Sequence, residues 1–298
     1  MEWKEKLISL YFYISESKAL KNYLSTVRQS NNRSFDFTDE EAITIYLFGI
    51  LQKHSEVKDI YNYTKDHLSN WFPNLPSYQA FDNRLNTISG VFAVLIKELI
   101  KEGTGRLLFV NESLLDSMPI IVAGKNRSSS ARVGRDVCGK GYCSSKELYY
   151  YGLKLHLMGF VRPGTLPMPE YCFVTDAKEN DLVAARPLLE QVYNRKVYAD
   201  KIYGDSDFIQ LLEQLNNTTI ITPIKRKKGQ LLEDAADNLF SKAVSGIRQP
   251  IESIFNWINA KTQIQNATKV RSTKGLMVHV WAKFAAALFM LCFSVFNP

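Results

Sequence analysis

The stretch Leu148–Val161, LYYYGLKLHLMGFV, decides the fold. Its apolar residues alternate along the chain and it is rich in Tyr and Leu, which is the signal of a β-strand. Working outward, we expect further strands at Leu107–Leu115, Tyr171–Thr175, Lys196–Ala199 and Thr218–Thr222, and helices at Asp181–Tyr193 and Gly204–Leu215. Three strands in a meander, followed by helix, strand, helix and strand, predict an α/β fold: a five-stranded mixed sheet with helices on its faces.

Residues 1–102 have a different character and are expected to form a helical domain, with the α/β domain over 103–298. Thr38-Asp39-Glu40-Glu41 is a capping box before the apolar segment Ile43–Leu51. Ser55 is expected to cap a helix over Glu56–Leu68, and Ser77 another over Tyr78–Thr87. This order resembles a helix-turn-helix module, whose last helix enters the DNA major groove.

The helix over Tyr78–Thr87 carries Gln79, Asn83 and Arg84 on one side, with Phe81 and Leu85 on the other. Asn and Gln pair well with adenine and Arg with guanine, so this side could read bases. The alternative is a helical bundle whose polar face is merely solvated.

Composition favours a polyanionic partner. The 298 residues include 37 Lys and Arg against 30 Asp and Glu, a net charge of +7 with a pI near 9.0. Four scattered cysteines and an N-terminus without a signal-peptide pattern predict a cytoplasmic protein with reduced thiols. The apolar segment 276–296 is expected to be a buried helix, because its uninterrupted part, Phe284–Phe293, is far shorter than the ~20 residues that a bilayer requires.

Three carboxylates stand where one fold could gather them. Asp116 and Asp200 each follow a strand-like run, and Glu252 lies on a candidate helix four residues after Arg248. Oxygen ligands of this kind suit Mg²⁺, and two such ions can hold the attacking and leaving oxygens of a phosphodiester. Each residue also has an ordinary alternative: Asp116 as a turn residue, Asp200 as a helix cap, and Glu252 as the i,i+4 partner of Arg248.

Other polar residues near these motifs are expected to be structural. Asp181 is expected to cap a helix, and Asp205 and Asp207 to lie in a first helical turn, where acids suit the helix dipole. Asp176 is expected to be structural as well. His156 alternates with apolar neighbours and is expected to be a satisfied strand histidine.

The segment Ala123–Lys146 is expected to be a flexible basic loop. It holds six basic residues and one acidic residue, a net charge of +5, interleaved with Gly and Ser. Such a loop can contact DNA phosphates, although a solvated surface loop is the alternative. The residues of this loop that we expect to contact DNA are Arg127, Arg132, Arg135 and Lys140. Lys225–Lys228 forms a second, smaller basic cluster.

The order of these motifs resembles a DDE transposase of a bacterial insertion sequence, in the superfamily of ribonuclease H and retroviral integrase. The resemblance covers most of the chain and is strongest over Tyr149–Thr222. It is carried by Tyr151–Leu157, Thr175-Asp176-Ala177, Asn180-Asp181, Ala199-Asp200-Lys201-Ile202-Tyr203 and Ile220–Pro223.

The resemblance implies a ribonuclease H-like fold and a metal-binding catalytic triad of Asp116, Asp200 and Glu252. The implied cofactor is a pair of Mg²⁺ ions, with Mn²⁺ as a substitute. It also implies that Arg248 and Lys201 contact DNA. The implied partners are the terminal inverted repeats and target DNA, bound by a homodimer or larger assembly at the bacterial nucleoid.

Around the third carboxylate the chain departs from the pattern Tyr-x2-Arg-x3-Glu-x6-Lys. Ser245 stands at the tyrosine position and Asn259 at the lysine position, with Lys261 two residues further on. Ile202 replaces the glycine that often follows the Asp-Lys pair. The interpretation is a transposase that cleaves transposon ends and transfers the 3′-hydroxyl strand. The alternatives are a stand-alone nuclease of the same fold and a decayed DNA-binding remnant.

Overall fold

A computed structural model describes residues 2–27, 36–105, 107, 110–143, 147–225 and 234–296, and only the backbone of Lys125. The chain divides into two compact units. The helical unit comprises Met1–Glu102, Arg132–Asp136 and Ile258–Pro298, and the sheet unit comprises Gly103–Ala131 and Val137–Trp257. The helical unit therefore joins residues from both ends of the chain.

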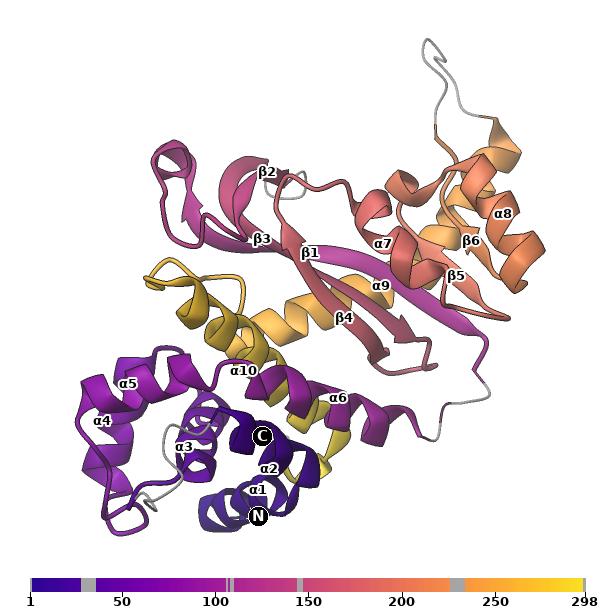
Figure 1. The fold of residues 1–298 in the computed structure, drawn as a ribbon. Coiled ribbons are helices and arrows are strands. Elements are labelled where there is room, and N and C mark those ends of the chain that lie inside the picture. Colours follow the sequence, from indigo (N-terminus) through magenta and orange to yellow (C-terminus); the bar gives the residue numbers. More distant parts are fainter. Residues whose placement is uncertain are drawn as a thin grey trace. The chain divides into compact units, whose positions relative to one another are not determined.

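The helical unit contains six N-terminal helices and a long C-terminal helix among its described residues (Figure 1). They are α1 (Trp3–Glu16), α2 (Lys18–Thr26), α3 (Asp39–Leu51), α4 (Val57–His67), α5 (Tyr78–Thr87), α6 (Val91–Thr104) and α10 (Thr273–Cys292), followed by the 3₁₀ turn η4 (Ser294–Phe296).

Local capping defines where two of these helices begin. The Thr38 hydroxyl accepts the Glu41 N–H at 3.2 Å, and the Glu41 carboxylate accepts the Thr38 N–H at 2.7 Å, so the predicted capping box is confirmed. Ser77 caps α5 as predicted, and Phe81 and Leu85 are buried on its inner side. The predicted Ser55 cap is wrong, because α4 begins after Glu56 and has no side-chain cap.

Helices α3 and α10 form the centre of this unit. α3 is buried on all sides from Ala42 to Ile50, and α10 packs against α3 and α5. α10 is long and apolar enough to cross a membrane by length and composition alone, yet 72% of its most apolar window is buried within the protein. That burial agrees with the predicted core helix.

The sheet unit is built on a mixed sheet, as predicted. Its strands are β1 (Glu112–Gly124), β2 (Gly139–Cys143), β3 (Leu148–Phe160), β4 (Met168–Asp176), β5 (Lys196–Ala199) and β6 (Thr219–Ile221). β1 pairs antiparallel with β3 and parallel with β5, which pairs parallel with β6. β4 and β2 both pair antiparallel with β3. The order β4-β3-β1-β5-β6 is that of a ribonuclease H-like sheet, with β2 as a sixth strand.

β2 corrects the expectation of a flexible loop over 123–146. The described part of segment 123–146 contains a 3₁₀ helix, η1 (Lys125–Ser129), and the five residues of β2. The pairing of β2 with β3 runs from Gly139↔Gly152 to Cys143↔Leu148. Residues 144–146 lie outside the described residues, as do 226–228 of the second basic cluster and 106, 108 and 109 of the first predicted strand.

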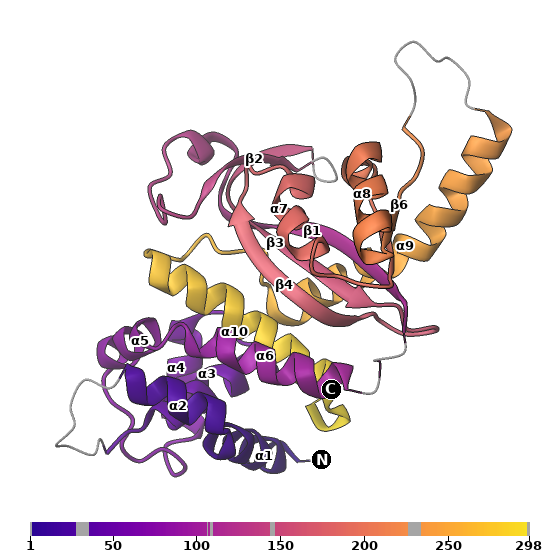
Figure 2. The same cartoon turned by 45° about the vertical axis from the view of Figure 1, so that its right-hand side comes forward.

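Helices cover the sheet and complete its core. On one face, α7 (Asp181–Leu189) and α8 (Ser206–Asn216) contribute Ala185 and Phe208 to a cluster with Leu115 and Val197. The long helix α9 (Ala235–Thr262) approaches β1 through Arg248, which contacts Asp116. Figure 2 shows α7 and α8 on one side of β1 and α9 on the other.

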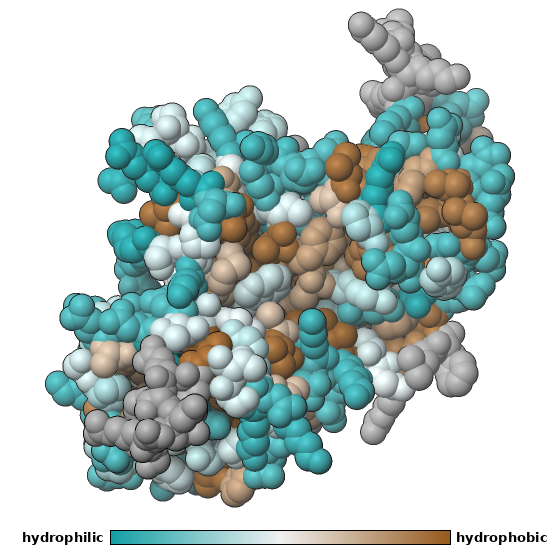
Figure 3. Space-filling view, viewed as in Figure 1, coloured by the Kyte–Doolittle hydropathy of each residue, from teal (hydrophilic) through white to brown (hydrophobic). Residues whose placement is uncertain are grey.

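α8 also has an exposed apolar side. Phe208 and Leu212 face the core, whereas Leu211 and Leu215 are 45% and 69% exposed. Figure 3 shows hydrophobic side chains gathered in this part of the surface.

Candidate active site

Strand β1 and helix α9 meet through one arginine. Arg248 Nη1 donates to Asp116 Oδ2 at 2.8 Å, and its Nη2 donates to Glu252 Oε1 at 2.6 Å. The second contact is the i,i+4 pair expected on a helix. The first joins residues that are 132 positions apart. Arg248 thus brings two of the three predicted carboxylates to a single cation.

The pairing of β1 with β5 brings Asp200, the remaining predicted carboxylate, close to Asp116. β5 is parallel to β1, with Ala199 opposite Leu115. Asp116 is the next residue of β1, and Asp200 is the first residue after β5, so both follow the same paired position. Asp116 was predicted to follow the end of a strand, but it lies inside β1. Asp200 precedes the 3₁₀ helix η3 (Lys201–Tyr203) but makes no side-chain cap bond, so its carboxylate is not used for capping.

Burial makes Asp116 a poor place for an isolated negative charge. Its side chain is 19% exposed. Burial raises the pKa of Asp116 to about 6, although Arg248 and the Ser117 N–H, which bonds Oδ1 at 2.8 Å, act in the opposite direction. The carboxylates of Asp200 and Asp181 raise this pKa further. The site therefore has an excess of negative charge that a further cation would relieve.

Asp181 belongs to this site, and its interpretation as a helix cap is wrong. The cap of α7 is Asn180, whose Oδ1 accepts the N–H groups of Leu182 and Val183. Asp181 instead accepts Lys154 Nζ at 2.8 Å and the Ser117 hydroxyl at 3.2 Å. The sequence did contain one sign of this role: Lys154 is a charged residue within a largely buried strand and therefore requires an acidic partner.

Two aromatic residues complete the surroundings. Tyr203 is fully buried, and its hydroxyl has no hydrogen-bond partner among the described residues. Its pKa is raised well above the ordinary value by burial and then by Asp181, Asp116 and Asp200, so it lies among these carboxylates. His156 is a buried strand histidine whose Nε2 lies 2.8 Å from the Thr175 hydroxyl and whose ring stacks on Phe173. Its buried Nδ1 has no hydrogen-bond partner among the described residues, so the prediction of a satisfied histidine is confirmed only for Nε2.

Comparison with known families gives this arrangement a context. A family model for the transposase DDE domain matches residues 113–289, from β1 into α10. The chain belongs to the DDE transposase family. A search of curated proteins finds no match. As a member of this family the transposase is an enzyme of the transposase and nuclease type that acts on DNA, and the family generally uses divalent metal ions.

The acidic side chains of the transposase fit such an ion by their chemistry. All three predicted ligands offer carboxylate oxygens, which Mg²⁺ prefers. In the described part of the chain no group of three or more His, Cys, Asp and Glu residues is arranged to hold a metal ion. At this site Arg248 pairs with both Asp116 and Glu252 and supplies a positive charge there.

The candidate DNA contacts of the transposase are mostly accessible. The exposed residues among them are Arg127, Arg132, Arg135, Lys140, Lys201, Gln79 and Asn83. Arg84 differs, because its guanidinium forms a two-point ion pair with Asp39 and its side chain is only 18% exposed. Arg84 is therefore engaged within the helical unit, and only Gln79 and Asn83 of the predicted reading face are exposed.

The departures near Glu252 have local consequences. Ser245, at the tyrosine position of the resemblance, is exposed on α9. Asn259, at the lysine position, accepts the Gln265 N–H at 3.2 Å and so shapes the turn after the helix. Asn259 therefore has a structural role of its own.

Proposed function

We propose that this transposase hydrolyses the phosphodiester at the ends of its insertion sequence and then joins the freed 3′-hydroxyl to target DNA. The observation that carries the proposal is the Arg248 bridge between Asp116 and Glu252, beside an Asp200 that strand register sets next to Asp116. These are the three carboxylates that the family resemblance implied as ligands.

The residues of the chain divide the chemistry between them. Asp116, Asp200 and Glu252 would hold two Mg²⁺ ions, which supply charge neutralisation at the phosphate and activation of the attacking oxygen. Arg248 holds α9 against β1 and keeps Glu252 on the side of Asp116. Because the nucleophile is water or a DNA hydroxyl, no covalent bond to the protein is required.

Cleavage of DNA that flanks the gene tests the proposal. Wild-type protein with Mg²⁺ or Mn²⁺ should nick DNA at the element's ends and join the 3′-end to a second duplex. Asp116→Asn, Asp200→Asn and Glu252→Gln should each abolish both steps. Asp207→Asn is the matched control, because Asp207 is an exposed acid in the first turn of α8.

The outcomes also separate the alternatives. Cutting without joining would indicate a stand-alone nuclease of this fold. Specific DNA binding without metal-dependent cutting would indicate a decayed remnant. Retained cutting by all three carboxylate variants would show that the active site lies elsewhere.

End recognition is assigned to α5 in this proposal. Gln79 and Asn83 lie four residues apart on the exposed side of the helix, opposite the buried Phe81 and Leu85. Replacing both polar residues with Ala should remove the preference for end sequence, since each good base contact discriminates by ~1–3 kcal/mol. Nonspecific binding should remain. A preference that survives in this double variant would move recognition to another surface.

Joining two ends requires both to be held in one complex, so we expect a dimer or larger assembly on DNA. Mass measurement of the protein with one and with two end duplexes tests this expectation. A complex that contains one chain and still joins two ends would contradict it.

A further inference from the structure

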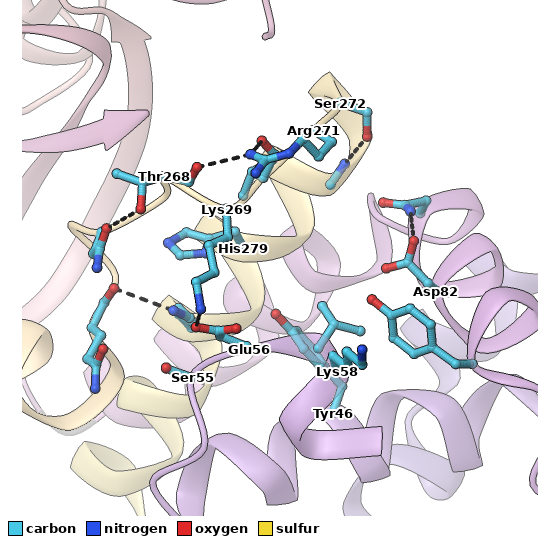
Figure 4. Close-up of a pocket in the computed structure, with 18 residues that line it drawn as sticks. Tyr46, Ser55, Glu56, Lys58, Asp82, Thr268, Lys269, Arg271, Ser272 and His279 are labelled. Carbon is cyan, nitrogen blue, oxygen red and sulfur yellow. Dashed lines mark hydrogen bonds and ion pairs between the residues drawn. The ribbon is translucent and has the colours of Figure 1, made fainter. Parts of the chain in front are cut away.

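The helical unit contains a pocket that the catalytic proposal does not use. It has a volume of about 470 Å³ and is lined by α3, α4 and α5, by the segment between α9 and α10, and by the first turns of α10. Figure 4 shows Lys58 and Asp82 on the N-terminal helices and Lys269 and Arg271 on the C-terminal segment. All of its lining residues belong to the helical unit.

The pocket has an excess of positive charge. Its lining includes four basic residues, Lys58, Lys269, Arg271 and Lys283, and the two carboxylates of Glu56 and Asp82, a net charge of +2 when Lys283 is protonated. Glu56 is already engaged in an ion pair with Lys269. Asp82 is engaged too, because it accepts a hydrogen bond from Asn86 Nδ2 at 3.2 Å.

Lys283 is the member of this set that most needs a partner. The residue is only 1% exposed, and its ammonium donates to the Gln263 carbonyl at 3.4 Å. A lysine has three N–H donors, and a buried charge is costly unless it is paired. Burial lowers the pKa of Lys283 to about 7, while the charge of Glu56 acts in the opposite direction.

Two further features suit an anion at the same place. α10 begins at the pocket, where Ser272 caps it by accepting the Gly275 N–H at 3.0 Å, and a helix N-terminus attracts negative charge. Arg271 Nη1 donates to the carbonyls of Thr268 and Val270, each at 3.0 Å, which fixes its guanidinium at the rim. The basic residues therefore come from three parts of the chain: α4, the segment before α10, and α10 itself.

We propose that this pocket binds a phosphate group, with Lys283 as its buried ligand and Arg271 as its ligand at the rim. Phosphate offers several acceptor oxygens at once, which matches a set of lysines, an arginine and a helix N-terminus better than a single carboxylate does. The phosphate can come from the DNA backbone or from a free phosphorylated small molecule. The first source rests on the proposed function, whereas the phosphate site itself does not.

The test measures binding of inorganic phosphate and of a random-sequence DNA duplex to the full-length protein by calorimetry. Lys283→Met keeps the side-chain stem and removes the charge, and it should weaken phosphate binding roughly tenfold or more. Glu56→Gln should act in the opposite direction and tighten binding, because it frees Lys269 and removes a negative charge from the pocket. Lys65→Gln, an exposed lysine of α4 outside the pocket, is the matched control and should leave binding unchanged.

The two ligands distinguish the two sources. A parallel loss of duplex and phosphate binding in Lys283→Met, with phosphate competing against the duplex in the wild type, assigns the site to the DNA backbone. Loss of phosphate binding with unchanged duplex binding assigns it to a small phosphorylated molecule. Either result supports a phosphate site.

Two results would overturn the proposal: a folded Lys283→Met protein that binds phosphate as the wild type does, or a Glu56→Gln protein that binds it more weakly. If Lys283→Met does not fold, Arg271→Gln replaces it, with the same expected loss. Metal-dependent cleavage is scored separately with Asp116→Asn. Failure of the catalytic proposal would thus leave the phosphate result intact.

Discussion

Replacing Asp116 with Asn should stabilise the metal-free protein at alkaline pH while it abolishes activity. Burial raises the pKa of Asp116 from 3.8 to about 6 in the folded protein. The folded state therefore holds this proton more tightly than the unfolded state. The resulting stability is fully present below pH 3.8 and is lost as the pH rises through about 6. Asn has no charge at any pH, so the Asp116→Asn protein does not lose this stability as the pH rises.

The expected size follows from the shift in pKa. One pKa unit corresponds to about 1.36 kcal/mol, so the wild type should be destabilised by roughly 3 kcal/mol at pH 8 relative to the variant. At pH 5 the same pKa shift gives a difference in unfolding free energy between variant and wild type that is about half as large. The amide oxygen of Asn can still accept the Ser117 N–H, so this local contact persists.

Urea unfolding followed by circular dichroism, in EDTA at pH 5 and pH 8, measures the difference. Glu252→Gln is the control, because Glu252 is 56% exposed and its pair with Arg248 should contribute under about 1 kcal/mol at either pH. Added Mg²⁺ should then stabilise the wild type more than Asp116→Asn, since a ligand of the folded state raises its stability. The reasoning is refuted if Asp116→Asn is less stable than the wild type at pH 8, or if the difference is the same at both pH values.

Three further predictions concern charge and burial elsewhere in the protein. Neutralising the exposed arginines Arg127, Arg132 and Arg135 should weaken the salt dependence of DNA binding. The slope of log binding constant against log salt concentration should become shallower by about 0.9 for each lost phosphate contact, and an unchanged slope would remove these arginines from the interface. Lys154→Met should destabilise the protein by roughly 3 kcal/mol in urea unfolding, because it leaves the largely buried Asp181 without its cation. Adding Asp181→Asn should recover most of that loss, and a fully stable single variant would contradict the role of the pair. Tyr203→Phe removes a buried hydroxyl that has no partner among the described residues, so it should stabilise the metal-free protein by about 1 kcal/mol, and a loss of stability would show that the hydroxyl is satisfied.

Local patterns were sufficient for much of the fold. The capping box at Thr38 and the cap at Ser77 depend on residues three positions apart, so the sequence contains both partners. The alternation over Leu148–Val161 marked β3, and the apolar run before Asp200 marked β5. β2 was missed because Gly139–Cys143 has little strand character of its own and is a strand only through its pairing with β3.

The candidate site shows the same division. The sequence by itself determined that Asp200 follows a buried strand and that Arg248 and Glu252 share one helical face, since both depend on neighbouring residues. Only the tertiary structure decided that Asp181 turns toward Lys154 and Ser117, while the adjacent Asn180 caps the helix. It also decided that Arg84 is held by Asp39, and that Lys283 is enclosed in a pocket with Glu56. These contacts join residues 27 to more than 200 positions apart, and their partners are chosen by packing and by the cost of leaving a buried charge alone.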